Sequence, residues 1–253
     1  MYKKVYLLPT VEIAGRFAMF ANPASGAQLC SYPIPTPTAL KGILECVHFM
    51  KQCVVRIGKV NICKKPVYGT FGFNATVSAW RKTAHRSAGH SLQRTFSPLC
   101  DVVYQIYAYV ENIDASELID VSMSERAIAY QSRNPRQNNA AHAYQSIFTR
   151  KLLLGQFTRN PCLGKRIFES SYCGPVRLDG EGTAIHKPCE EVNFVVPNIP
   201  TCYFNKIQHG TEVSPTFTQN VEVKNGVVVF DARINSLCDM TRMQTNQGAF
   251  VNA

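Results

Sequence analysis

The chain of 253 residues carries 27 Lys and Arg residues against 17 Asp and Glu residues, which gives a net charge of +10. This length suits one large domain or two modest ones, and such a chain buries roughly 70 to 75% of its unfolded surface, so it needs no disulfide bonds to fold. The sequence has no run of about 18 apolar residues, which excludes a membrane-spanning helix.

The ten cysteines are scattered along the chain, and none forms a C-x-x-C pair. The first residues, MYKKVYLLPTVEIAG, lack the apolar h-region and the cleavage site of a signal peptide. We therefore expect a cytoplasmic protein whose cysteines are reduced and mostly pack in its interior. No cysteine or histidine pair has the close spacing of zinc ligands, so we expect neither a metal nor a cofactor.

The first predicted elements are a strand and a helix. Residues 9–21 (PTVEIAGRFAMFA) mix alternation with aromatic residues and predict a strand in the middle of a sheet. After a loop, Thr36 and Pro37 supply an N-cap and a proline at the first helical position, where its missing N–H costs nothing. The apolar stripe of this helix recurs at helical spacing as Leu40, Ile43, Leu44, Val47 and Met50.

His48 lies between the last two residues of this apolar stripe and is the first candidate for chemistry. If the helix stays regular, His48 shares a polar face with Lys41 and Glu45 and points away from the core. A histidine there is either a solvated helix residue or a group that meets a ligand. Residues 53–63 (CVVRIGKVNIC), just after the helix, are β-branched and partly alternating, and predict a second strand.

Residues 67–97 are rich in Gly, Thr, Ser, Arg and His with little periodicity, which predicts a long loop or an irregular hairpin. The segment RKTAHRSAGHSLQR (81–94) lies within it. Cations mixed with aromatic side chains are suited to phosphates and stacked bases, and the aromatics here are Phe71, Phe73, Trp80 and Phe96. The alternative is a disordered basic loop with no fixed ligand.

The next three elements complete a recognisable order. Residues 101–111 (DVVYQIYAYVE) are the clearest strand, and 115–130 have helical spacing with an acidic face. Residues 136–156 predict a second helix, closed by Gly155. The order matches a ferredoxin-like (RRM-like) βαββαβ unit, an α+β fold that is a common RNA-binding platform. We expect this domain to span residues 1–165, with the long basic loop at about 67–97.

After residue 165 the sequence changes to short β-like runs separated by turns. Residues 190–197 form one such run, and 221–232 (VEVKNGVVVFDA) predict a hairpin. Asn225 and Gly226 are the pair that a type I′ turn requires. We expect a small antiparallel β-rich C-terminal domain over residues 166–253.

The basic residues are segregated along the chain. Residues 46–100 contain nine Lys or Arg residues and no acid, and 126–168 contain eight and no acid. Between them, 111–125 carries five of the 17 acids. Such segregation builds a one-signed electrostatic field that attracts a polyanion such as a nucleic acid. The alternative is a surface that is merely basic and solvated.

Four segments together suggest a family: SYPIPTPTALKGILECVHF, LCDVVYQIYAYVE, FTRKLLLGQFTRNPCLGKRIF and VKNGVVVF. In this order and at these separations, the chain resembles the fifth CRISPR-associated (Cas) family in its type I-C or Dvulg form, a RAMP-type group of CRISPR RNA-binding proteins. The resemblance reaches from about Val11 to Phe230. Its most specific parts are the TPTALKGILE helix and the LGQ…P-x-LG-x-R block.

The resemblance implies a ferredoxin-like domain with a small β-rich C-terminal part. It also implies binding of the repeat-derived 5′ handle of CRISPR RNA in a Cascade-type surveillance complex that engages target DNA. The implied protein partners are the backbone subunit (Cas family seven) and the large subunit (Cas family eight). In type I-C systems this family member is also expected to cut precursor CRISPR RNA without metal.

Metal-free RNA cleavage needs a base for the attacking 2′-OH, a proton for the leaving 5′-oxygen and a cation for the charge on the phosphorane. Alignment with the family pattern places His48 where relatives carry a tyrosine. It places Ala143 and Tyr144 where relatives carry a Lys-His pair, with His142 one residue earlier. The exchange leaves His48, Tyr144 and His142 as the candidate catalytic residues.

Two interpretations of this exchange remain open. A rearranged site could use His48 as acid or base with Tyr144 or His142, while Lys151 or an arginine stabilises charge. Alternatively, the nuclease is lost and the chain is a non-catalytic clamp, or it is a stand-alone basic RNA-binding protein unrelated to CRISPR. The expected RNA contacts are Arg81, Lys82, Arg86, Arg94, Arg150, Lys151 and Arg166.

Overall fold

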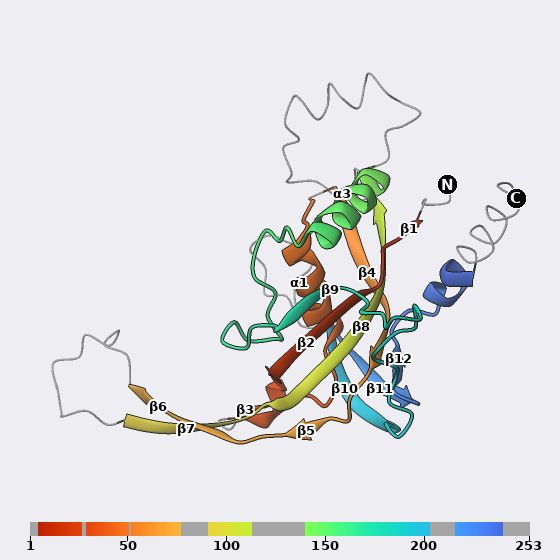
Figure 1. Cartoon of the computed structure of the whole chain (residues 1–253). Coiled ribbons are helices and arrows are strands. Elements are labelled where there is room, and N and C mark those ends of the chain that lie inside the picture. The colour runs from red at the N-terminus through yellow and green to blue at the C-terminus, as the bar shows by residue number, and fades with distance from the viewer. Residues whose placement is uncertain are drawn as a thin grey trace, which may run out of the picture.

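The computed structural model describes residues 5–26, 29–50, 52–76, 91–112, 140–202 and 216–239. Nine strands build one antiparallel sheet, and Figure 1 shows helices α1 and α3 beside it. The elements in chain order are β1 Val5–Leu7, β2 Val11–Ala18, a 3-10 turn at Pro23–Ser25, β3 Leu29–Cys30, α1 Pro37–Val47, β4 Cys53–Ile62, β5 Val67–Tyr68, β6 Phe71–Thr76, β7 Ser91–Ser97, β8 Leu99–Asn112, α3 Ala140–Leu154, β9 Tyr172–Pro175, β10 Phe194–Cys202, β11 Thr216–Lys224 and β12 Val227–Val229.

The main sheet has nine strands, with β1 and β5 paired to β8 beside the path β10-β11-β12-β4-β8-β2-β9. The long strand β8 lies between β4 and β2, and each of these has a further strand on its other side. The strands predicted over 9–21, 53–63 and 101–111 are confirmed, and the first lies inside the sheet as predicted. Their alternation decides which face is apolar: the even-numbered residues of β8 from Val102 to Val110 belong to the hydrophobic core beneath the helices.

Helix α1 begins as its sequence predicts. The Thr36 side chain accepts a hydrogen bond from the Ala39 N–H at 3.2 Å, Pro37 is the first helical residue, and the buried residues are Leu40, Ile43, Leu44 and Val47. The prediction for His48 is wrong, because the helix ends at Val47. His48 is the C-cap in an extended conformation, with φ −154° and ψ 136°, and it does not lie on the polar face with Lys41 and Glu45.

Helix α3 packs on the same side of the sheet as α1. Its buried face consists of Ala141, Tyr144, Phe148 and Leu152, all of which join the core cluster that contains the buried residues of α1. Gly155 follows the helix with φ +64°, as a C-terminal glycine should, so the second predicted helix and its end are confirmed. The predicted acidic helix over 115–130 lies outside the described residues.

Strands β6 and β7 form an antiparallel ribbon that extends away from the body of the protein, with β3 beside β7 (Figure 1). A long loop or an irregular hairpin was predicted over 67–97; its described part consists of this ribbon and of β5, which pairs with β8. Arg94 lies in β7, opposite Phe73 of β6. Arg81, Lys82 and Arg86 lie outside the described residues.

The predicted turn at Asn225 and Gly226 is confirmed: both residues have positive φ, 50° and 71°, and Val223 pairs with Val228 across the hairpin. A side chain at Gly226 would approach the Cys189 carbonyl oxygen to 2.6 Å. Strand β12 then pairs with β4, so strands from both sides of residue 165 join one sheet. The domain division at 165/166 stays a prediction. Within the described part of the chain, no helix is long and apolar enough to span a membrane.

Candidate functional site

The end of α1 meets the middle of α3 through His48 and Tyr144. The Tyr144 hydroxyl donates to the His48 carbonyl oxygen at 2.5 Å, and the two rings lie 5.0 Å apart. On its other side the Tyr144 ring stacks on Phe148 at 5.9 Å. Tyr144 is only 1% exposed, and its burial raises the pKa of the phenol strongly. Tyr144 therefore holds His48 in place, and its hydroxyl is already committed to that contact.

The His48 imidazole faces Lys151, one of the cations expected from the sequence. Its Nδ1 lies 3.5 Å from the Lys151 Nζ, a long contact. Burial, and secondly the Lys151 charge, lower the pKa of His48 below its ordinary value. A lysine ammonium can only donate, so Nδ1 is the acceptor and the proton of the neutral ring sits on Nε2. Nε2 is buried, and no described residue accepts its proton.

The segment after α3 caps the end of α1. The N–H groups of Thr158 and Arg159 donate to the Cys46 carbonyl oxygen at 2.8 and 3.3 Å. The Thr158 hydroxyl lies 3.4 Å from the Val47 carbonyl oxygen and 3.4 Å from the Lys151 Nζ. These contacts satisfy carbonyl groups that a helix end leaves without partners. They also fix residues 156–166 beside α1, close to His48.

An open cleft of about 690 Å³ lies between α1 and the residues that follow the cap. Arg159 and Arg166 bring positive charge to it, opposed by one acid, Glu169. The lining residues are Thr38, Ala39, Gly42, Ile43, Cys46, Arg159, Asn160, Cys162, Gly164, Arg166 and Glu169. Gly42 lines the helix side of the cleft, and a side chain there would meet nothing within 4 Å, so the cleft wall is open at this point.

Gly164 fixes the position of the cleft's second wall. It has φ +89°, and a Cβ atom there would lie 1.9 Å from the Met19 carbonyl oxygen, so only glycine fits. The adjacent Leu163 is fully buried and donates its N–H to Phe168. Two residues beyond Gly164, Arg166 is exposed at the cleft. In the LG-x-R motif, Leu163 and Gly164 therefore anchor the chain, and Arg166 is exposed at the cleft.

The structure brings together three of the predicted site residues, His48, Tyr144 and Lys151. His142 lies elsewhere on α3, exposed and edge-on to the Tyr6 ring at 5.4 Å. Arg150 is exposed on the same helix and has no contact with this cluster among the described ones. The catalytic and RNA-binding roles assigned to these residues from the sequence remain predictions.

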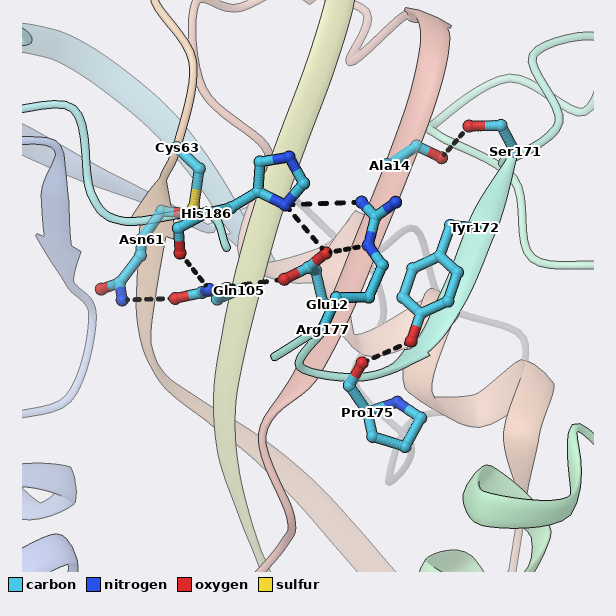
Figure 2. Close-up of polar contacts among 10 residues, drawn as sticks. All are labelled: Glu12, Ala14, Asn61, Cys63, Gln105, Ser171, Tyr172, Pro175, Arg177 and His186. Carbon is cyan, nitrogen blue, oxygen red and sulfur yellow. Dashed lines mark hydrogen bonds and ion pairs between the residues drawn. The ribbon is translucent and has the colours of Figure 1, made fainter. Parts of the chain in front are cut away.

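A second polar cluster lies on the face of the sheet opposite the helices, and Figure 2 shows it. Its centre is Glu12 of β2, which is 0% exposed. Arg177 Nε donates to Glu12 Oε1 at 2.6 Å, and His186 Nδ1 lies 3.2 Å from the same oxygen. Gln105 Nε2 lies 3.5 Å from the other carboxylate oxygen. The buried charge of Glu12 is therefore paired and hydrogen-bonded, as a buried charge must be.

The Glu12 cluster attaches the segment after β9 to the sheet. Gln105 also donates to the His186 carbonyl oxygen at 2.7 Å and accepts from Asn61 at 3.0 Å, so three neighbouring strands contribute (Figure 2). The Arg177 guanidinium lies over the Tyr172 ring at 4.3 Å. Sequence reasoning missed this cluster, although an acid within a buried strand and a glutamine in the apolar strand β8 were visible signals. Arg177 and His186 cover part of this face of the sheet.

The comparisons with known proteins agree on one family. The model of the CRISPR-associated protein (Cas_Cas5) family matches residues 10–114. A Thermus thermophilus protein named CRISPR pre-crRNA endoribonuclease Cas5d is 25% identical over 68% of this chain and 64% of its own length. A Mannheimia succiniciproducens protein of the same name is 24% identical over 64% of this chain and 70% of its own length.

A solved structure described as a CRISPR-associated protein has the same fold, with a TM-score of 0.59 and 19% identity over 92% of this chain and 94% of the other. The described residues thus define a mixed α/β protein with one large antiparallel sheet and few helices. The resemblance found in the sequence is confirmed: the Cas5 family model matches the N-terminal part of the chain, and both relatives carry the name Cas5d. The match spans less than two thirds of the length of the Thermus relative.

Proposed function

We propose that this chain binds the repeat-derived 5′ handle of CRISPR RNA as a subunit of a type I-C-like surveillance complex. The observation that carries the proposal is the line of cations along one side of α1. Lys151 lies beside the end of the helix, and Arg159 and Arg166 line the adjacent cleft. A phosphate backbone lying along this line would meet three positive charges, in a chain whose net charge is +10.

The order of the elements supports an RNA-binding role of this kind. When β3 and β5 to β7 are left aside, strands β2, β4, β8 and β9 and helices α1 and α3 have the chain order of a ferredoxin-like βαββαβ unit, with both helices on one face. In RRM domains the opposite face stacks bases. Because Glu12, Arg177 and His186 cover part of that face here, we place the RNA on the helix side instead.

We further propose that the same site cuts precursor RNA without metal, because His48 and Lys151 adjoin the cleft as a base and a cation would. As RNA binds, the Lys151 ammonium turns from His48 to the phosphate, and the freed Nδ1 of neutral His48 accepts the 2′-OH proton as the 2′-oxygen bonds to the phosphorus. Lys151 stabilises the negative phosphorane and gives a proton to the leaving 5′-oxygen as the P–O bond breaks. Tyr144 holds the His48 backbone and touches no reacting atom.

The test incubates the purified chain with precursor repeat RNA in EDTA. Wild type is compared with His48→Ala, Lys151→Met and Tyr144→Phe, and with Lys224→Gln as a control at an exposed lysine on β11. We expect cleavage to fall at least about a hundredfold in His48→Ala and to be unchanged in Lys224→Gln. Cleavage that persists in His48→Ala contradicts the catalytic proposal.

Binding without cleavage by wild type would favour the alternative, a non-catalytic clamp at the same cleft. In that case Arg159→Gln and Arg166→Gln should each weaken RNA binding and reduce its salt dependence by about one counterion. Unchanged affinity in both variants contradicts the cleft as the RNA site. Co-purification with a backbone subunit and a large subunit, and with target DNA once RNA is loaded, separates the CRISPR role from a stand-alone RNA-binding protein.

A further inference from the structure

Four phenylalanines from four separate segments meet where the β6–β7 ribbon leaves the body. The Phe17 ring lies 4.6 Å from Phe71 in an edge-to-face arrangement, and Phe168 lies 6.4 Å from Phe17 on another side. Phe96 of β7 pairs with Phe71 of β6, so the two side chains project to the same face. These four residues, Phe17, Phe71, Phe96 and Phe168, are called the aromatic cluster below.

Two cations flank the aromatic cluster. The Arg16 guanidinium lies 5.2 Å from the Phe17 ring centre, and the Lys165 Nζ lies 4.7 Å from the Phe96 ring centre. Arg16 is exposed, and Phe71 is 39% exposed although it is a large apolar residue. The accessible ring of the aromatic cluster therefore lies in a positively charged setting, which makes a purely apolar ligand a poor match.

The aromatic cluster continues from the cleft. Gly164 and Arg166 line the cleft, whereas Lys165 and Phe168 belong to the aromatic cluster and its cations. One short segment therefore borders both surfaces. A strand whose phosphates lie on Arg159 and Arg166 would reach the aromatic cluster within a few nucleotides. Bases stack on aromatic side chains while neighbouring cations hold the phosphates, which is the chemistry of single-stranded nucleic-acid binding.

We propose that the aromatic cluster is a base-stacking site for single-stranded RNA, with Phe71 as its accessible ring and Arg16 and Lys165 as its phosphate contacts. The proposal rests on the RNA binding proposed above and adds a site for the bases to a cleft that contacts phosphates. It gives the accessible Phe71 ring and the cations over Phe17 and Phe96 a common ligand. The site should bind RNA that carries bases more tightly than a backbone without bases. It should accept any base, because every base has an aromatic face.

The test compares two RNA probes with Phe71→Ala: single-stranded repeat RNA and an oligonucleotide of equal length with abasic riboses and the same phosphates. We expect the variant to bind the repeat RNA at least about fivefold more weakly and the abasic probe as tightly as wild type. Its salt dependence should be unchanged. Phe71→Tyr, which keeps the ring, should retain wild-type affinity, and Phe217→Ala removes an equally exposed phenylalanine (39%) on β11 as a control.

Several results would overturn the stacking site. If Phe71→Ala loses the same affinity for both probes, or loses affinity for neither, the stacking site is contradicted. The proposed function still stands in these cases, provided that wild type binds the repeat RNA. Tighter binding of single-stranded DNA than of RNA contradicts the choice of RNA. If Phe71→Ala binds RNA as wild type does but no longer co-purifies with other subunits, the aromatic cluster contacts a protein partner and not RNA. Wild type that binds neither probe contradicts both proposals.

Discussion

The two polar clusters on opposite faces of the sheet differ in how their groups are satisfied. The described residues around Glu12 form hydrogen bonds and ion pairs with Glu12 or with one another, which makes a closed network within the chain. At the end of α1, His48 keeps a buried Nε2 with no described partner, and the open cleft along the same helix is lined by Arg159 and Arg166. A closed network stabilises the fold, whereas an incompletely satisfied one beside exposed charge is available to a ligand.

This comparison predicts the largest loss of stability at the Glu12 cluster. Arg177→Met removes the closest partner of a carboxylate that is 0% exposed. Breaking a buried ion pair costs about 3 to 5 kcal/mol, and we expect the lower end because Arg177 is 36% exposed and His186 remains as a partner. Chemical denaturation measures the change. The double variant Glu12→Gln/Arg177→Met should recover part of the loss, and an Arg177→Met protein as stable as wild type contradicts the closed-network account.

Gly164→Ala should have the next largest effect, and it should lower both the stability of the fold and the affinity for RNA. The new methyl group would collide with the Met19 carbonyl oxygen at a backbone angle that disfavours side chains. We expect a loss of about 1 to 3 kcal/mol and weaker RNA binding, because Arg166 moves with this segment. Gly180→Ala, at an open position, is the control and should change stability by less than about 0.5 kcal/mol. Loss of stability with full RNA affinity would separate Gly164 from the cleft.

The smallest effect concerns the His48 pKa. The Lys151 charge is the second cause that lowers it, after burial, so Lys151→Met should raise the His48 pKa toward 6.5. NMR titration of the imidazole measures this value, with Lys224→Met as the control. A pKa that does not move contradicts the His48–Lys151 contact.

The lowered pKa of His48 should also make the stability of the fold depend on pH. A histidine whose pKa is lowered by folding stabilises the folded state fully above the unfolded pKa of 6.5. This contribution is lost as the pH falls from 6.5 through the lower folded pKa, because the unfolded chain takes up the proton first. Lys151→Met should reduce this loss, which denaturation at a series of pH values between about 4.5 and 7.5 measures.

The sequence predicted local structure where local signals decide it. Thr36 and Pro37 start α1, Gly155 ends α3, and Asn225 with Gly226 make the hairpin turn, because each position needs a particular backbone geometry. The end of α1 was predicted less well, since apolar spacing continues to Met50 while the helix stops at Val47. Contacts from Tyr144 and Thr158, about 100 residues away in sequence, hold the chain beyond that end.

The candidate site shows the same limit. Family resemblance pointed to His48 and Tyr144, and the structure brings them together but commits the Tyr144 hydroxyl to a backbone carbonyl. Glu12, Arg177 and His186 meet only through strand pairing between distant segments, which periodicity does not reveal. The aromatic cluster was half visible: Phe71 and Phe96 stood beside the basic loop in the sequence, while Phe17 and Phe168 join them only in the fold.

The proposed RNA site lies on the helix side of the sheet, along α1 and the segment after α3. Photo-crosslinking of 4-thiouridine repeat RNA to the purified chain, followed by mass spectrometry of the crosslinked peptides, tests it most directly. RNA bound on the helix side should form crosslinks within residues 38–48 and 151–168. Crosslinks confined to β4, β8 and residues 176–189, the face that Glu12 and Arg177 close, would contradict it.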